Sequence, residues 1–192
     1  MKRIGIIILS LLLTGFCLTY CSNKEQSGNL KEEQAKALIE QQYASSSKWY
    51  KETKDQILKQ STLKADCTVS TYNENRSFKT DHFYLDGHEF MSKGFKDGIL
   101  AVEIFFSKNE AFELRREICE NGASSFEGIM YQGEFVGLST WRNCNGNLSE
   151  QGNRYNDRKI GIWKKFDRDG ELTEVTDYKE IEKLNLFPAI RN

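Results

Sequence analysis

Proline is almost absent from this sequence, and cysteine and histidine are scarce. The 192 residues include one proline, five cysteines and two histidines. The CxxC spacing of zinc sites does not occur, and neither do Walker-type or dinucleotide-binding glycine motifs. The sequence has 27 basic residues (Lys and Arg) and 28 acidic residues (Asp and Glu). It therefore has no excess of basic residues that would indicate a nucleic-acid partner. We therefore expect no cofactor and no nucleic acid.

Reactive side chains do not gather into a recognisable catalytic or metal site. One cluster has metal-ligand chemistry: His82, Asp86, His88 and Glu89. A two-residue Asp-Gly turn would place His82 several residues up the ladder from His88, so the two imidazoles would not converge. The serines of GASSFEG lack the last glycine of a nucleophile elbow. The sequence predicts neither an enzyme nor a metal centre.

The N-terminus has the layout of an export signal. Lys2 and Arg3 precede an uncharged apolar run, Ile4 to Tyr20, which is short for a membrane span. The last residues of this segment, LTYC, resemble a bacterial lipobox, and that resemblance implies lipidation of Cys21. An uncleaved anchor and cleavage by the ordinary signal peptidase are the alternatives, and each exports the protein. We expect residues 1–21 to be a signal peptide of a membrane-anchored lipoprotein of the bacterial cell envelope.

A polar tether and a helical segment follow the signal. Residues 22–29, SNKEQSGN, are small and polar, as in flexible linkers. Residues 30–62 lack glycine and proline, and their apolar residues recur at helical spacing. The three serines at 45–47 are poor helix-interior residues and are a candidate break between two helices.

The stretch from Tyr131 to Tyr178 repeats one pattern at a spacing of 24 residues. The pattern consists of a tyrosine, a glycine, an Asn/Asp-Gly pair, a leucine and a glutamate. Its first copy is Tyr131, Gly137, Asn145, Gly146, Leu148 and Glu150. Its second copy is Tyr155, Gly161, Asp169, Gly170, Leu172 and Glu174. Two further pairs lie in phase, at Asp97, Gly98 and at Asn121, Gly122. Such pairs favour hairpin tips. The period predicts an elongated antiparallel sheet of consecutive β-hairpins over residues 66–178, in a mainly β fold with an N-terminal helix covering one face.

The second repeat resembles the variant MORN repeat of bacterial proteins named YwqK-like antitoxin components. That pattern reads Tyr-x-Asp/Gly-x-x-x-Gly-x-Trp-x-x-Phe/Tyr-x-x-x-Gly-x-Leu. The matching residues are Tyr155, Asp157, Gly161, Trp163, Phe166, Gly170 and Leu172. In the first repeat Trp141 lies two places late, and Cys144 replaces an aromatic residue. The resemblance implies a scaffold or binding module.

Strand-like stretches separated by turn residues precede the clear repeats. They cover residues 67–72, 77–85, 88–95 and 99–106. The last of these is the most apolar stretch after the signal, and we expect it to be a fully buried strand. Residues 179–192 are a tail in which 179–186 could form a short helix.

The final hairpin allows two registers. A two-residue turn at Asp169 and Gly170 sets Lys165 opposite Glu174. A three-residue loop sets Phe166 opposite Leu172 and Lys164 opposite Glu174. The sequence leaves both open.

Three cysteines follow Cys21, and they allow at most one intramolecular disulfide. Cys119 and Cys144 are assigned to equivalent strands of neighbouring hairpins, one residue out of phase. Such positions point to opposite faces, two strand spacings apart. We therefore expect any bridge to involve Cys67.

The repeat places equivalent aromatic side chains in rows along the sheet. The candidate binding face consists of Tyr131, Trp141, Tyr155 and Trp163, because interfaces are enriched in such residues. We expect a non-catalytic lipoprotein attached to the membrane by its N-terminal lipid, with a protein as its partner. The alternative, which the family name suggests, is an antitoxin or immunity protein that neutralises a toxin.

Overall fold

The computed structural model describes the backbone of residues 5–190 and the side chains of residues 33–190. The chain divides into two compact units, Met1–Gln41 and Gln42–Asn192. The predicted start of the signal peptide, at Lys2 and Arg3, and the side chain of the lipidation candidate Cys21 lie outside the described residues. Within the described part, no helix has both the length and the apolar character needed to cross a membrane.

A single helix, α1 (Gly5–Ser61), precedes the strands. The candidate break at the three serines is wrong, because the helix is continuous through residues 45–47. Ser46 is 2% exposed, and its hydroxyl donates a hydrogen bond of 2.7 Å to Asn153 Oδ1 on the sheet. This contact offsets the weak helix propensity of serine. The residues predicted as a tether, 22–29, also lie within α1.

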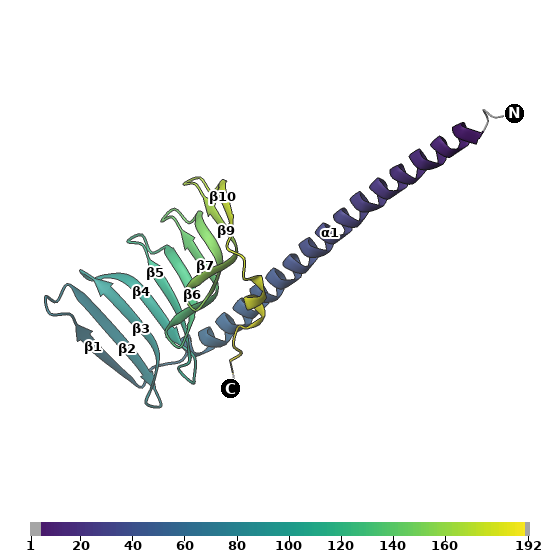
Figure 1. Ribbon diagram of the computed structural model, residues 1–192. Coiled ribbons are helices and arrows are strands. Elements are labelled where there is room, and N and C mark those ends of the chain that lie inside the picture. The colour runs from purple at the N-terminus through teal and green to yellow at the C-terminus, as the bar shows by residue number, and fades with distance from the viewer. Residues whose placement is uncertain (1–4, 191–192) are drawn as a thin grey trace. The chain divides into compact units, whose positions relative to one another are not determined.

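The rest of the chain forms one antiparallel sheet of ten strands in sequence order (Figure 1). The strands are β1 (Cys67–Tyr72), β2 (Phe78–Leu85), β3 (His88–Lys96), β4 (Ile99–Phe106), β5 (Phe112–Ile118), β6 (Ser124–Tyr131), β7 (Glu134–Arg142), β8 (Leu148–Tyr155), β9 (Arg158–Phe166) and β10 (Leu172–Asp177). A short 3-10 helix, η1 (Ile181–Asn185), follows. The predicted mainly β fold of consecutive hairpins with an N-terminal helix is confirmed.

The four in-phase Asn/Asp-Gly pairs lie between consecutive strands. They occupy alternate turns, β3–β4, β5–β6, β7–β8 and β9–β10, and therefore one edge of the sheet. Their glycines all have positive φ: Gly98 (84°), Gly122 (84°), Gly146 (94°) and Gly170 (93°). The 24-residue period of the sequence corresponds to two strands and their two turns.

The last hairpin combines features of both predicted registers. Phe166 pairs with Leu172, as a three-residue loop requires, whereas Lys165 pairs with Glu174, as in the two-residue turn. A bulge between Leu172 and Glu174 reconciles them, because it adds one residue to β10. Lys165 Nζ lies 2.8 Å from Glu174 Oε2.

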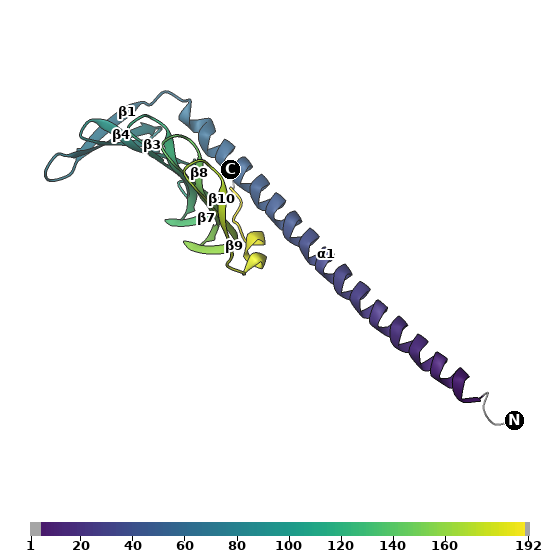
Figure 2. The same ribbon diagram turned by 90° about the horizontal axis from the view of Figure 1, so that it is seen from above.

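The two faces of the sheet differ in what covers them. On the helix face, residues 42–61 of α1 pack against the sheet. Ile57 of α1 shares a buried apolar cluster with sheet residues Phe105, Phe112, Leu114, Ile129 and Val136. Figure 2 shows these last turns of α1 and η1 on the same side of the sheet. Among the described residues of 42–192, no helix or second sheet covers the other side, the open face. The sheet therefore has its main apolar core on the helix face, where α1 packs.

The expected full burial of residues 99–106 is wrong. In β4 only Phe105 is buried, at 5% exposure, and Ile99 is 47% exposed. The reason is that α1 covers the helix face alone, so alternate residues of β4 face solvent.

Glycines at equivalent repeat positions bring α1 close to the sheet. Gly137 in β7 has a φ of 72°, and Gly161 in β9 has a φ of 60°. Each lies where the pairing with the preceding strand shifts its register. The ring of Trp49 lies against Gly137, and the hydroxyl of Tyr43 lies against Gly161. Six helical residues rise about 9 Å, and two strand spacings measure about 9.5 Å. The helix can thus contact successive hairpins at the same position of the repeat.

Candidate functional site

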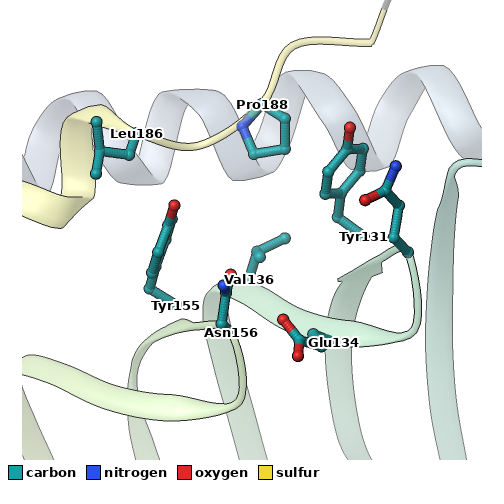
Figure 3. A pocket seen from close by; sticks show the side chains of 8 residues that line it. Tyr131, Glu134, Val136, Tyr155, Asn156, Leu186 and Pro188 are labelled. Carbon is teal, nitrogen blue, oxygen red and sulfur yellow. The ribbon is translucent and has the colours of Figure 1, made fainter.

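A hollow of about 380 Å³ lies on the helix face, between two turns and the C-terminal tail. Its lining residues are Tyr131, Gln132, Glu134, Val136, Tyr155, Asn156, Leu186 and Pro188. The tyrosines end β6 and β8, and Gln132 and Asn156 begin the turns that follow. In Figure 3 the two rings stand on opposite sides of the hollow, with Val136 between them. The repeat thus builds its two walls.

The C-terminal tail roofs this hollow and is held in place by α1. Trp49 Nε1 donates a hydrogen bond of 2.7 Å to the carbonyl of Pro188. The ring of Trp49 also lies 5.0 Å from that of Phe187, centroid to centroid. This role could not be predicted from the sequence, because residues 186–190 have neither helical nor strand periodicity.

The open face carries an unbroken row of aromatic rings. Phe126 contacts Phe135 at 5.3 Å and Trp141 at 4.7 Å, measured between ring centroids. Trp141 continues to Trp163 at 5.7 Å, and Trp163 to Tyr178 at 6.4 Å. The rings belong to β6, β7 and β9 and to the residue after β10. Their contacts connect these strands on the side that α1 does not cover.

Two cations lie on this aromatic row. The guanidinium of Arg154 is 5.8, 5.3 and 5.6 Å from the rings of Phe135, Trp141 and Trp163. Lys159 Nζ lies 4.1 Å from the Trp163 centroid and 2.6 Å from Glu150 Oε1. Distances below about 6 Å favour cation–π attraction. The open face therefore combines aromatic and cationic groups. Neither cation was predicted from the sequence to lie on a binding face.

The four residues predicted as one binding face are divided between the two faces. Tyr131 and Tyr155 line the hollow on the helix face. Trp141 and Trp163 belong to the row on the open face. Trp163 is 2% exposed, and its ring lies over Gly152, so it fills the sheet and cannot present its ring to a partner. The prediction of a single face is wrong. Tyr131 pairs with Glu134 and Tyr155 pairs with Arg158. The tryptophans lie an odd number of positions after these paired residues, so alternation along the strand puts them on the opposite face from the tyrosines.

A partly buried ionic cluster joins α1 to β5 and β6. Glu127 accepts hydrogen bonds from Lys54 (2.5 Å), Tyr50 (2.8 Å) and Arg116 (2.8 Å). Burial raises the pKa of the Glu127 carboxyl, but these three donors outweigh it and hold the pKa below its usual range. Burial, together with the neighbouring carboxylate, raises the pKa of Tyr50. All four groups have partners within the cluster, which indicates a structural role.

The two histidines lie apart and have separate partners. His88 pairs with Leu85, and His82 pairs with Ser92, several residues up the ladder, so the two imidazoles do not converge, as predicted. His82 Nδ1 lies 2.8 Å from Glu89, and His88 Nδ1 lies 3.1 Å from Glu110. Among the described residues, no group of three or more His, Cys, Asp or Glu side chains is arranged to hold a metal ion.

A disulfide joins Cys119 to Cys144, with a Cα–Cα distance of 5.8 Å. The expectation that these residues are too far apart is wrong. Both lie beyond the strand ends, in the β5–β6 and β7–β8 turns, where neighbouring hairpin tips approach each other. Cys67, expected in any bridge, is free and exposed on β1.

Asparagine side chains also connect neighbouring tips along this edge. Asn121 Nδ2 donates to the carbonyl of Cys144 at 2.7 Å, and Asn145 Nδ2 donates to that of Arg168 at 3.2 Å. On the opposite edge Asp157 Oδ1 accepts a 2.7 Å bond from the backbone N–H of Phe135. These repeat residues therefore hold successive hairpins together.

Comparison with known proteins identifies no family. No family model matches the chain, and no curated protein matches it. Three solved structures show low similarity. A crystal structure of TarM has 11% identity and a TM-score of 0.31, covering 62% of this chain and 20% of that one. A mutant TarM from S. aureus, in complex with fondaparinux, alpha-GlcNAc-glycerol and UDP, has 14% identity and a TM-score of 0.24, covering 55% and 26%.

The third structure, a GtfA/B complex, has 10% identity and a TM-score of 0.24, and the match covers 68% of this chain and 24% of that one. The chain thus spans about a quarter or less of each of these proteins. Similarities at this level carry no conclusion about its function.

Proposed function

We propose that this protein is a non-catalytic lipoprotein of the bacterial cell envelope that binds a protein partner through the open face of its sheet. The observation that carries the proposal is the aromatic and cationic row on that face. Tryptophan, tyrosine and arginine dominate the energetics of protein interfaces, and Trp141, Arg154 and Tyr178 lie together here. A resemblance to the variant MORN repeat also favours a binding module.

Two features support export. The apolar N-terminal run after Lys2 and Arg3 has the layout of a signal. The disulfide between Cys119 and Cys144 is of a kind that persists in oxidising compartments and is rare in the cytosol. The lipobox-like residues before Cys21 support attachment to a membrane through a lipid.

Site-specific photocrosslinking in the native bacterium tests the binding face. A photoreactive residue replaces Lys165, which lies on the open face, and in a matched strain it replaces Lys36 on α1. We expect one protein to crosslink from position 165 only, and to be lost when Trp141→Ala is added. Equal crosslinking from both positions, or crosslinking that survives Trp141→Ala, would contradict the proposal. A partner with a toxin domain would favour the immunity function.

Mass spectrometry of the N-terminus tests the anchor. We expect the mature chain to begin at a diacylated Cys21 in the membrane fraction, and Cys21→Ser to block this processing. An unmodified chain that begins at Met1 would favour the uncleaved anchor instead.

A further inference from the structure

The hollow beneath the C-terminal tail has a single charged group among its lining residues. Glu134 supplies a carboxylate at the start of β7. The other seven residues are uncharged: Tyr131, Gln132, Val136, Tyr155, Asn156, Leu186 and Pro188. Val136, at 1% exposure, belongs to the packed core. The hollow therefore combines two aromatic walls with polar and apolar lining groups and one negative charge.

The repeat sets the distance between the two aromatic walls. Tyr131 and Tyr155 end β6 and β8, which are separated by β7. Strands two apart lie roughly 9.5 Å from each other. A group midway between the rings would be about 5 Å from each, within the 6 Å over which a cation is attracted to an aromatic face.

The walls and roof are fixed by packing. The ring of Tyr131 lies 4.9 Å from the buried ring of Phe112, centroid to centroid. Pro188 is held by the hydrogen bond from Trp49. Such a preformed site binds without the cost of ordering its own side chains.

One wall already accepts a cation from within the protein. Lys183 Nζ lies 5.8 Å from the centroid of the Tyr155 ring, and Glu180 holds this ammonium at 2.7 Å. Lys183 does not line the hollow. Tyr155 therefore accepts a cation within the protein and also lines the hollow.

We propose that this hollow binds a quaternary ammonium group of the choline type, between Tyr131 and Tyr155 and against the carboxylate of Glu134. Charge complementarity and ring spacing are its basis. The site lies on the helix face, whereas the proposed protein-binding surface lies on the open face. The two proposals can therefore fail separately.

Calorimetric titration of the full chain in dodecyl maltoside micelles tests this site. The probes are choline chloride and its neutral isostere, 3,3-dimethylbutan-1-ol. We expect choline to bind at least tenfold more tightly, because only the charged probe gains cation–π and carboxylate attraction. Equal affinity for the two probes, or no binding of choline, would overturn the proposal. Tighter binding of N-acetylglucosamine than of choline would assign the hollow to a sugar instead.

Substitutions locate the binding energy. Tyr155→Leu should weaken choline binding roughly tenfold, whereas Tyr155→Phe, which keeps the ring, should bind within about twofold of wild type. Glu134→Gln should weaken it severalfold without altering the melting temperature, since Glu134 is exposed. Glu171→Gln, on the opposite edge of the sheet, is the matched control. A loss with Tyr155→Phe as large as with Tyr155→Leu would contradict a π contact.

The ammonium group could belong to a soluble ligand or to a lipid head group, and two probes distinguish these sources. Free phosphocholine and phosphatidylcholine vesicles present the same group in solution and on a membrane. Competition of free phosphocholine with choline, together with vesicle binding that Glu134→Gln leaves unchanged, indicates a soluble ligand. Vesicle binding that Glu134→Gln abolishes indicates a lipid head group. Binding of neither source would refute the site.

Discussion

Strands β6 to β9 and strands β1 and β2 follow the same hairpin plan but are packed very differently. Every residue of β1 is exposed, and every residue of β2 is half-buried. In β7 and β9, by contrast, buried residues occur on both sides of the bulge glycines. The sheet is continuous, so the difference lies in what each region packs against.

The difference follows from glycine at equivalent positions of the repeat. At Gly137 and Gly161 the chain has positive φ and no Cβ, and Trp49 and Tyr43 of α1 occupy the space. The first two strands have no glycine within them. The clearest part of the repeat is therefore also the part to which the helix docks, and the four predictions below test this contrast.

The largest expected effect is that of Gly137→Val. A β-branched residue resists positive φ, and its side chain would displace Trp49, so we expect a loss of about 3–5 kcal/mol in the free energy of unfolding. Gly98→Val is the control, because Gly98 has a similar φ of 84° but no atom within 4 Å of an added Cβ. It should lose only about 1–2 kcal/mol. Equal losses in urea melts would mean that helix docking contributes nothing.

Removal of the disulfide should have the next largest effect. Cys119 and Cys144 are 25 residues apart and join two hairpins of the repeat region. Cys119→Ala should lower the free energy of unfolding by about 2–4 kcal/mol. Cys67→Ala, on exposed β1, should leave it unchanged. Thermal melts with and without reductant measure both, and a reductant effect that persists in Cys119→Ala would argue against this pairing.

Glu127→Gln tests the ionic cluster beneath α1. The change should lower the free energy of unfolding by about 1–3 kcal/mol at neutral pH, because Lys54 and Arg116 lose their partly buried anionic partner. The folded pKa of Glu127 lies below its unfolded value of about 4.3. Its contribution is therefore present above the unfolded pKa and is lost as the pH falls through the folded pKa.

The same substitution thus predicts a pH dependence. Wild-type stability should fall between about pH 5 and pH 3 more steeply than that of Glu127→Gln. Glu171→Gln is the control, since Glu171 is exposed in the β9–β10 turn. Parallel acid profiles of wild type and Glu127→Gln in denaturant titrations would show that the cluster does not stabilise the fold.

One identical substitution in each region should give the smallest effects. Val136 is 1% exposed and Val69 is 44% exposed. Val136→Thr should cost about 1–2 kcal/mol because it buries a hydroxyl, whereas Val69→Thr should change the stability by less than about 0.5 kcal/mol. Chemical denaturation compares the two. A cost at Val69 that matches the one at Val136 would remove the distinction between the regions.

The hairpin tips and the helix could be predicted from sequence because their causes are local. Asn-Gly and Asp-Gly pairs accept positive φ wherever they occur, and all four lie in turns. The continuity of α1 through residues 45–47 could not be predicted, because it depends on the contact between Ser46 and Asn153. The roof of the hollow likewise depends on Trp49, which is far from Pro188 in sequence.

Two predictions were wrong although the sequence contained evidence against them: the single binding face and the separation of Cys119 from Cys144. Strict alternation along β7 from Glu134 already puts Trp141 on the face opposite to Tyr131. Cys119 and Cys144 lie within two residues of Asn121 and Asn145, at the tips of neighbouring hairpins on one edge. They were assigned to strands rather than to turns, so their proximity was not predicted.

Hydrogen–deuterium exchange of the full chain tests the contrast between the two regions most directly. Slow exchange reports strands that open only when the packed structure is lost. We expect the slowest exchange in β5 to β9 and in residues 43–57 of α1, and markedly faster exchange in β1 and β2. Gly137→Val should raise exchange in β6 to β9 toward the level of β1. Uniform protection across all ten strands, or the slowest exchange in β1 and β2, would contradict the account.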